Sequence, residues 1–126
     1  MIKLNLNPKG IKTGDCVVRA IAYATQQSWD DVFIGLNEIA FKKKRVFNDK
    51  IVYENYLNEL GWKKQKQPRK MNGFKYTVDE FCENFKGVAI VTVANHMTAI
   101  ADHDVVDTWD CGHKTIGNYW VRENKK

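Results

Sequence analysis

The sequence is poor in the features that mark several special classes of protein. Its 126 residues contain two prolines and eight glycines, while 44% of the residues are hydrophobic and 28% are charged. This composition excludes a disordered polymer, a collagen-like chain and a disulfide-packed miniprotein. The longest apolar run, residues 87–94, is far shorter than the roughly 20 residues that a membrane-spanning helix needs. We therefore expect a globular protein without a membrane span. The length is below the usual size of two domains and predicts a single domain over residues 1–126.

Cysteine is also scarce. The three cysteines, Cys16, Cys82 and Cys111, are an odd number and cannot form a complete disulfide framework. Residues 1–7 include no apolar segment of signal-peptide length. Both observations predict a cytoplasmic, reducing environment. There a cysteine is buried apolar filler, a metal ligand or a nucleophile, and Cys82, between two phenylalanines, is typical of filler.

Positive charge is concentrated in one segment. The chain has 20 basic and 15 acidic residues, a net charge of +5, yet residues 42–70 alone hold ten basic and three acidic residues. A solvated helix end followed by a lysine-rich loop explains this pattern. A surface for an acidic partner or a nucleic acid explains it as well. No zinc-finger spacing, glycine-rich phosphate loop or RNA-recognition motif accompanies the charge.

The first two thirds of the chain predict helices. Asp15 is a natural N-cap for a helix that starts at Cys16, and Ser28 is one for a second helix. A third helix is expected over residues 50–60, and a loop or strand end over residues 62–73. Thr77, with Glu80 three positions later, predicts a capping box before a short fourth helix.

The last third of the chain predicts strands. β-Branched residues are frequent in residues 88–94, an extended pattern continues over 96–101, and further strands are expected over 105–109 and 117–121. Asp102, His103 and Asp104 are typical turn residues. Helices followed by an antiparallel meander predict an α+β fold.

Three residues in this layout predict nucleophilic catalysis. Cys16 would sit in the first helical turn, where free N–H groups and the helix dipole favour a thiolate. His96 opens a strand, and antiparallel pairing across the 102–104 turn would bring Asp107 within its reach. A nucleophile, a base and an orienting carboxylate make a Cys-His-Asp triad. Asp104 and Asp110 are alternatives for the carboxylate, and Cys16 or His96 taken alone is also typical of a core residue.

Three local segments resemble the papain-like cysteine peptidase superfamily. Residues 14–20 (GDCVVRA) look like its nucleophile helix and, with Asp before the cysteine, like bacteriocin-leader peptidases; residues 95–100 (NHMTAI) resemble its histidine strand. Residues 107–110 (DTWD) resemble its Asn-Ser-Trp-Gly segment, which implies an orienting role for Asp107 and a shielding role for Trp109. The resemblance implies a papain-like minimal core, with N-terminal helices packed on a C-terminal antiparallel sheet. Small proteins with similar segments occur in phage and prophage genomes, which would place this protein in the host cytoplasm.

The sequence departs from the family at the oxyanion hole. Gly10 stands where the family has an oxyanion-hole Gln, and Asn7 is the nearest upstream amide that could replace it.

The expected function is hydrolysis of a peptide or amide bond in a peptide or protein substrate, without a cofactor. The alternative is an inactive papain-like protein that binds a host protein or nucleic acid through residues 42–70. Residues 110–113 (DCGH), with His103 nearby, suggest a metal site, but no further ligand pair completes tetrahedral coordination, so we predict no metal.

Overall fold

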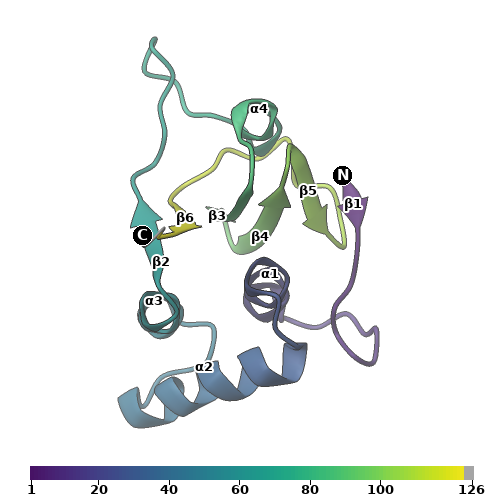
Figure 1. Cartoon of the computed structure of the whole chain (residues 1–126), viewed down its shortest axis with the longest axis vertical. Helices are drawn as coiled ribbons and strands as arrows, with labels where there is room; N and C mark the ends of the chain where they lie inside the picture. Colours follow the sequence, from purple (N-terminus) through teal and green to yellow (C-terminus); the bar gives the residue numbers. More distant parts are fainter. Residues whose placement is uncertain (124–126) are drawn as a thin grey trace.

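A six-stranded sheet with helices on both faces forms the body of the protein (Figure 1). The computed structural model describes residues 1–123, and all numbers of helices and strands refer to this range. The four helices are α1 (Cys16–Thr25), α2 (Trp29–Lys43), α3 (Lys50–Glu59) and α4 (Val78–Asn84). The strands are β1 (Ile2–Lys3), β2 (Trp62–Gln65), β3 (Val88–Val93), β4 (His96–Ala101), β5 (Asp104–Asp107) and β6 (Tyr119–Arg122). This is a mixed helix and sheet protein, compatible with the α+β class.

The helix starts follow from local capping. The Ser28 side chain accepts a hydrogen bond from the Asp31 N–H at 3.0 Å, and Thr77 and Glu80 form the predicted capping box of α4. Both predictions are confirmed. Asp15 stands at the N-cap position of α1, as predicted, but its side chain makes no capping hydrogen bond. Its carboxylate is used instead in a buried network described below.

Two tight connections set the register of the central strands. Asn95 adopts a left-handed conformation (φ 57°) in the turn between β3 and β4, and Val93 faces His96 across it. Asp102 and His103 also have positive φ in the turn to β5, which pairs antiparallel with β4 as expected. The predicted strand 105–109 instead ends at Asp107, so the residues after it are free to turn back toward β4.

The predicted antiparallel meander is incomplete in three respects. Strand order is β1-β5-β4-β3-β6-β2, and β1 pairs with β5 in parallel. β2 forms within the stretch expected to be a loop or strand end, and β6 lies between β3 and β2, spanning 119–122 rather than 117–121. The sheet therefore recruits strands from the start and the middle of the chain and is not purely C-terminal.

Alternating side chains of the sheet build two apolar clusters. Ile90 and Trp120 pack in a cluster with α1, α2 and α3 on one face. Ala89 and Val91 point to the other face and pack with α4, where Cys82 is buried as apolar filler. The N-terminal helices thus cover one face as expected, while α4 covers the opposite one (Figure 1). Within residues 1–123, no helix has the length and apolar character needed to cross a membrane.

Candidate active site

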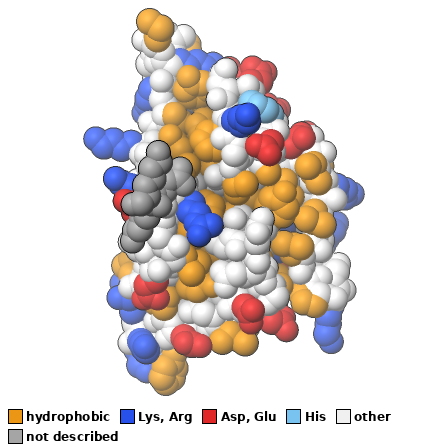
Figure 2. All heavy atoms as spheres, viewed as in Figure 1, with side chains coloured by type: hydrophobic (Ala, Val, Ile, Leu, Met, Phe, Trp, Pro, Cys, Tyr) orange, Lys and Arg blue, Asp and Glu red, His pale blue; other side chains and the backbone are white. Residues whose placement is uncertain are grey.

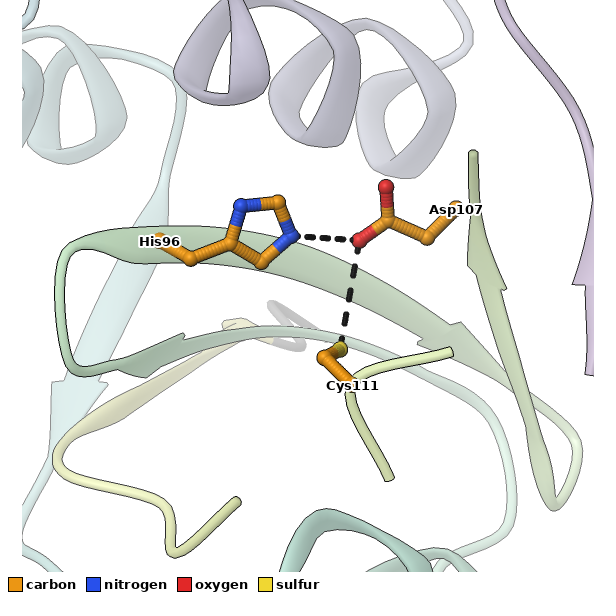
Figure 3. A group of neighbouring side chains, drawn as sticks. All are labelled: His96, Asp107 and Cys111. Atoms are coloured by element: carbon orange, nitrogen blue, oxygen red, sulfur yellow. Dashed lines mark hydrogen bonds and ion pairs between the residues drawn. The ribbon is translucent and has the colours of Figure 1, made fainter. Parts of the chain in front are cut away.

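His96 and Asp107 form a buried pair where β4 begins and the neighbouring β5 ends (Figure 3). His96 Nε2 lies 2.6 Å from Asp107 Oδ2, and the side chains are 8% and 2% exposed. The β3–β4 turn places His96 at the first position of β4, and Asp107 closes the neighbouring β5. Of the three carboxylates considered, only Asp107 reaches the imidazole, because Asp104 contacts the N-terminal amine and Asp110 accepts from the Gly112 N–H.

Both oxygens of the Asp107 carboxylate are engaged. Oδ1 accepts hydrogen bonds from Arg19 Nη1 at 3.0 Å and from the Thr108 N–H at 2.7 Å. Oδ2 faces His96 and lies 3.9 Å from the Cys111 thiol sulfur. Burial would raise the pKa of Asp107, but the hydrogen bonds from His96 and from the Thr108 N–H lower it to about 2. The group is therefore held as a carboxylate at neutral pH.

Cys16 lies on the other side of His96. It is the first residue of α1, it is half-buried, and it packs against the cluster that contains Met97. Burial would raise the pKa of the Cys16 thiol. A hydrogen bond with His96, a backbone hydrogen bond from Met97 and the charges of His96 and Arg19 together lower it below its ordinary value of 9.0. Figure 3 shows the second ring nitrogen of His96, Nδ1, pointing away from Asp107 toward the side on which α1 lies.

The surroundings of His96 raise the pKa of its imidazole, whereas those of Cys16 lower the pKa of the thiol. Burial alone would lower the pKa of His96, but its hydrogen bonds to Asp107, Cys111 and Cys16, with the charge of Asp107, raise this pKa well above 6.5. A lowered thiol pKa beside a raised imidazole pKa favours a thiolate and imidazolium pair. The carboxylate of Asp107 on one side and the thiol of Cys16 on the other thus shift the two pKa values in the directions that such a pair requires.

Asp15 anchors a second part of the network. Its Oδ1 accepts from Arg19 Nε at 2.8 Å, and its Oδ2 accepts from Asn7 Nδ2 at 3.1 Å and from Trp29 Nε1 at 3.0 Å. Asn7 is buried, and none of the three cavities that Cys16 lines includes it. The structure thus directs the Asn7 amide at a carboxylate rather than at the thiol, and the predicted oxyanion role of Asn7 gains no geometric support.

Two adjoining cavities open at the thiol. One of about 430 Å³ is bordered by the loop before α1, and one of about 370 Å³ is bordered by α3 residue Tyr53 and by β3. Cys16, Asn95 and His96 line both, so the cavities meet at the sulfur and the imidazole. Trp109 lines the first cavity, and its ring centroid lies 4.8 Å from that of His96. The indole covers one side of the imidazole, although it is itself 39% exposed.

One cluster among residues 1–123 has the residue types of a metal site. Ligand atoms of His96, Asp107 and Cys111 lie within 4.8 Å of one another. His96 Nε2 and Asp107 Oδ2 are separated by 2.6 Å, whereas two ligands of a tetrahedral zinc ion would lie roughly 3.4 Å apart. The spacing is that of a shared proton, so these residues in this arrangement do not fit a metal centre. His103, which the sequence suggested as a further ligand, is instead hydrogen-bonded to the Cys82 carbonyl through Nδ1 at 2.7 Å.

Two members of the site were not predicted from the sequence as part of it. The four-residue spacing of Asp15 and Arg19 is a helical ion-pair signal that could have drawn attention to Arg19. Its second carboxylate, on Asp107, is 88 positions away and has no such signal. Cys111 was considered only as a metal ligand, and the structure buries its thiol beneath the Asp107 carboxylate (Figure 3).

Comparison of the chain with protein-family models, with curated proteins and with solved structures gave no match. The papain-like resemblance therefore rests on its three local segments and stays a prediction. The structure itself shows a buried His and Asp pair flanked by two cysteines, a set of groups from which a catalytic triad could be built.

Proposed function

We propose that the protein is a cysteine-peptidase-like thiol hydrolase that cleaves a peptide or amide bond. Cys16 is the nucleophile, His96 the general base and Asp107 the residue that orients the imidazole. One observation carries this proposal. Cys16 and His96 line the same two cavities, and Asp107 is buried behind the imidazole with its carboxylate on Nε2. The nitrogen left for the thiol is Nδ1.

The reaction proceeds through an acyl-enzyme. His96 Nδ1 takes the proton of the Cys16 thiol, and the thiolate attacks the substrate carbonyl carbon. The imidazolium then protonates the departing amine as the carbon–nitrogen bond breaks, which leaves a thioester on Cys16. A water molecule gives a proton to His96 and attacks this thioester, which releases the carboxylic acid and restores the thiol. Asp107 stays ionised throughout and stabilises the imidazolium.

The choice of Cys16 over Cys111 follows from access. Cys111 is fully buried and lies against the Asp107 carboxylate, so its sulfur has no path to a substrate carbonyl. Cys16 is half-buried and opens onto both cavities. Its own backbone N–H, in the first turn of α1, has no partner within the helix and supplies an oxyanion donor. Asn5 lines the larger of the two cavities, but its side-chain amide is engaged: Nδ2 donates to the Ile11 carbonyl at 3.5 Å and Oδ1 accepts from the Asn7 N–H at 3.0 Å.

The substrate class follows from the same shape. Because the cavities lie on both sides of the thiol, an extended chain that continues in both directions from the cleaved bond fits better than a small terminal amide. We therefore propose a peptide or protein substrate, and a cytoplasmic site of action, in the host cytoplasm if the chain is phage-encoded. No cofactor enters the proposed reaction.

The pH dependence of Cys16 alkylation tests this function. Cys82 and Cys111 are replaced by serine, so that iodoacetamide reports on Cys16 alone. The midpoint of the rate profile should lie below pH 9.0, because His96 stabilises the thiolate, and it should rise in His96→Ala. His103→Ala is the matched control, since His103 binds the Cys82 carbonyl and should leave the midpoint unchanged.

An ordinary thiol midpoint that His96→Ala does not move would refute the proposed pair. A positive result justifies a peptide screen, in which Cys16→Ala should abolish turnover. Retention of turnover in Cys16→Ala would exclude Cys16 as the nucleophile.

A second candidate function is binding of nucleic acid through the basic segment 42–70 and the loop 66–76, which begins within that segment. Residues 62–76 carry six basic and no acidic residues. Loop residues 66–76 project from the body, and Met71 and Phe74 are 108% and 69% exposed. Figure 2 shows apolar side chains at this projecting end, with Lys and Arg side chains beneath them. An exposed aromatic ring among cations favours stacking with a base and pairing with phosphates.

Fluorescence anisotropy with a labelled single-stranded oligonucleotide tests this candidate. Binding should weaken steeply as salt rises, and Phe74→Ser should weaken it further because the stacking face is lost. Ile34→Ser, which changes an exposed apolar residue of α2 outside the basic segment, is the control. Binding of poly-glutamate in place of the oligonucleotide would point to an acidic protein partner instead.

A further inference from the structure

Arg19 joins the two ends of the candidate site. It lies on α1 three residues after Cys16, and its guanidinium contacts Asp15 at 2.8 Å through Nε and Asp107 at 3.0 Å through Nη1. The three side chains are 13%, 4% and 2% exposed. One cation thus links the residue before the nucleophile to the carboxylate that orients the base.

Arg19 compensates the negative charge of two buried carboxylates. Two carboxylates are buried near each other, and a buried charge without a partner is strongly unfavourable. Within residues 1–123, the cations within ion-pair distance of Asp107 are Arg19 and His96. His96 carries a proton only in part of the catalytic cycle, whereas an arginine stays charged throughout. Arg19 is therefore the permanent counter-charge of Asp107.

Geometry adds a second role. The planar guanidinium presents several N–H donors in fixed directions, so it can hold two carboxylates at once. Arg19 also reaches the Thr108 hydroxyl at 3.4 Å, next to the Asp107 backbone. Cys16 and His96 come from different elements, α1 and β4, and the Arg19 bridge fixes the start of α1 relative to the end of β5. The distance between thiol and imidazole depends on that placement.

We propose that Arg19 is a positioning residue that keeps Asp107 ionised and directed at His96 while it holds Cys16 against the imidazole. This inference rests on the proposed thiol hydrolase function. Without Arg19, Asp107 takes up a proton more readily or turns away, His96 loses its orienting partner, and the thiolate fraction of Cys16 falls. The lowering of the Cys16 pKa by the charge of Arg19 adds directly to this effect.

Alkylation of the single-thiol protein tests the inference, in Arg19→Gln and Arg19→Lys. The midpoint should rise in Arg19→Gln by about one pH unit, which makes alkylation about tenfold slower at any pH below both midpoints. Arg19→Lys should show a smaller rise, because one ammonium keeps the charge but cannot span both carboxylates. Arg45→Gln is the matched control, since Arg45 makes the same four-residue pair with Asp49 on the exposed surface.

The outcomes distinguish a failure of the Arg19 inference from a failure of the proposed thiol hydrolase function. If Arg19→Gln lowers the melting temperature but leaves the midpoint where it is in the parent, Arg19 is only structural and the inference is overturned. If Arg19→Gln does not fold, Arg19→Lys decides: a raised midpoint supports the inference and an unchanged one overturns it. If the parent protein itself shows an ordinary thiol, the proposed function fails before Arg19 is considered.

Discussion

Two cysteines of this chain show how the surroundings of a residue set its chemistry. Cys82 lies on the inner side of α4 among apolar side chains, and burial raises the pKa of its thiol to about 11. Cys16 is also partly buried, but His96, the Met97 backbone and Arg19 reverse the effect of burial and lower its pKa. The same side chain is thus inert filler in one place and a candidate nucleophile in the other.

Asp107 should make the stability of the protein sensitive to acid. Its folded-state pKa of about 2 lies below its ordinary value of 3.8, so its contribution is complete above pH 4 and is lost as pH falls toward 2. The difference corresponds to about 2 kcal/mol. His96 does not change the pH dependence of the free energy of unfolding below pH 4. Its folded-state pKa is raised, so it is protonated there in both the folded and the unfolded state.

Urea unfolding of the parent and of Asp107→Asn at pH 6, 4, 3 and 2 measures this contribution. The parent should be the more stable protein at pH 6, and its advantage should shrink by about 2 kcal/mol toward pH 2. A gap that stays constant over this range would show that the carboxylate gains nothing from its partners.

At the scale of elements, α4 depends on its first residues. It spans seven residues, too few for a stable isolated helix, and it packs Val78, Phe81 and Cys82 against the face of the sheet opposite α1. The Thr77 hydroxyl accepts from the Glu80 N–H at 3.1 Å, while the Glu80 carboxylate accepts from the Thr77 N–H at 2.9 Å. This capping box satisfies donors that a helix start leaves free.

Thr77→Ala should therefore lower the free energy of unfolding by about 1 kcal/mol, within a typical range of roughly 0.5–2 kcal/mol for a lost cap. Thr77→Ser keeps the hydroxyl and is the control. Thermal and urea unfolding compare the three proteins. Equal losses in both variants would mean that the Thr77 methyl group, rather than the cap, matters.

At the scale of the whole molecule, the sheet brings distant segments to one place. β1 comes from the first residues of the chain and β5 from near its end, yet they pair, and the Leu4 N–H donates to the Asp107 carbonyl at 2.9 Å. β6 is inserted between β3 and β2 rather than following β5. The candidate site thus lies where α1, β4 and β5 meet, and pairing with β1 holds the backbone of Asp107 on the side away from β4.

The sequence by itself determined what depends on neighbours within a few positions. The cap of α2, the capping box of α4, the strands β3 and β4 and the turn that brings β5 back were predictable, because side-chain capping, β-branched runs and turn residues act locally. The approach of Asp107 to His96 followed too, since a short turn fixes the register of a hairpin.

Only the tertiary structure decided the rest. The parallel pairing of β1, the insertion of β6 and the strand character of β2 depend on contacts between distant segments. The same holds for Arg19, which contacts Asp107 across 88 positions, and for Asp15, whose carboxylate pairs with Arg19 and makes no capping hydrogen bond. Such contacts form only when the core is packed, because a buried charge gains its partners from whichever elements the fold brings together.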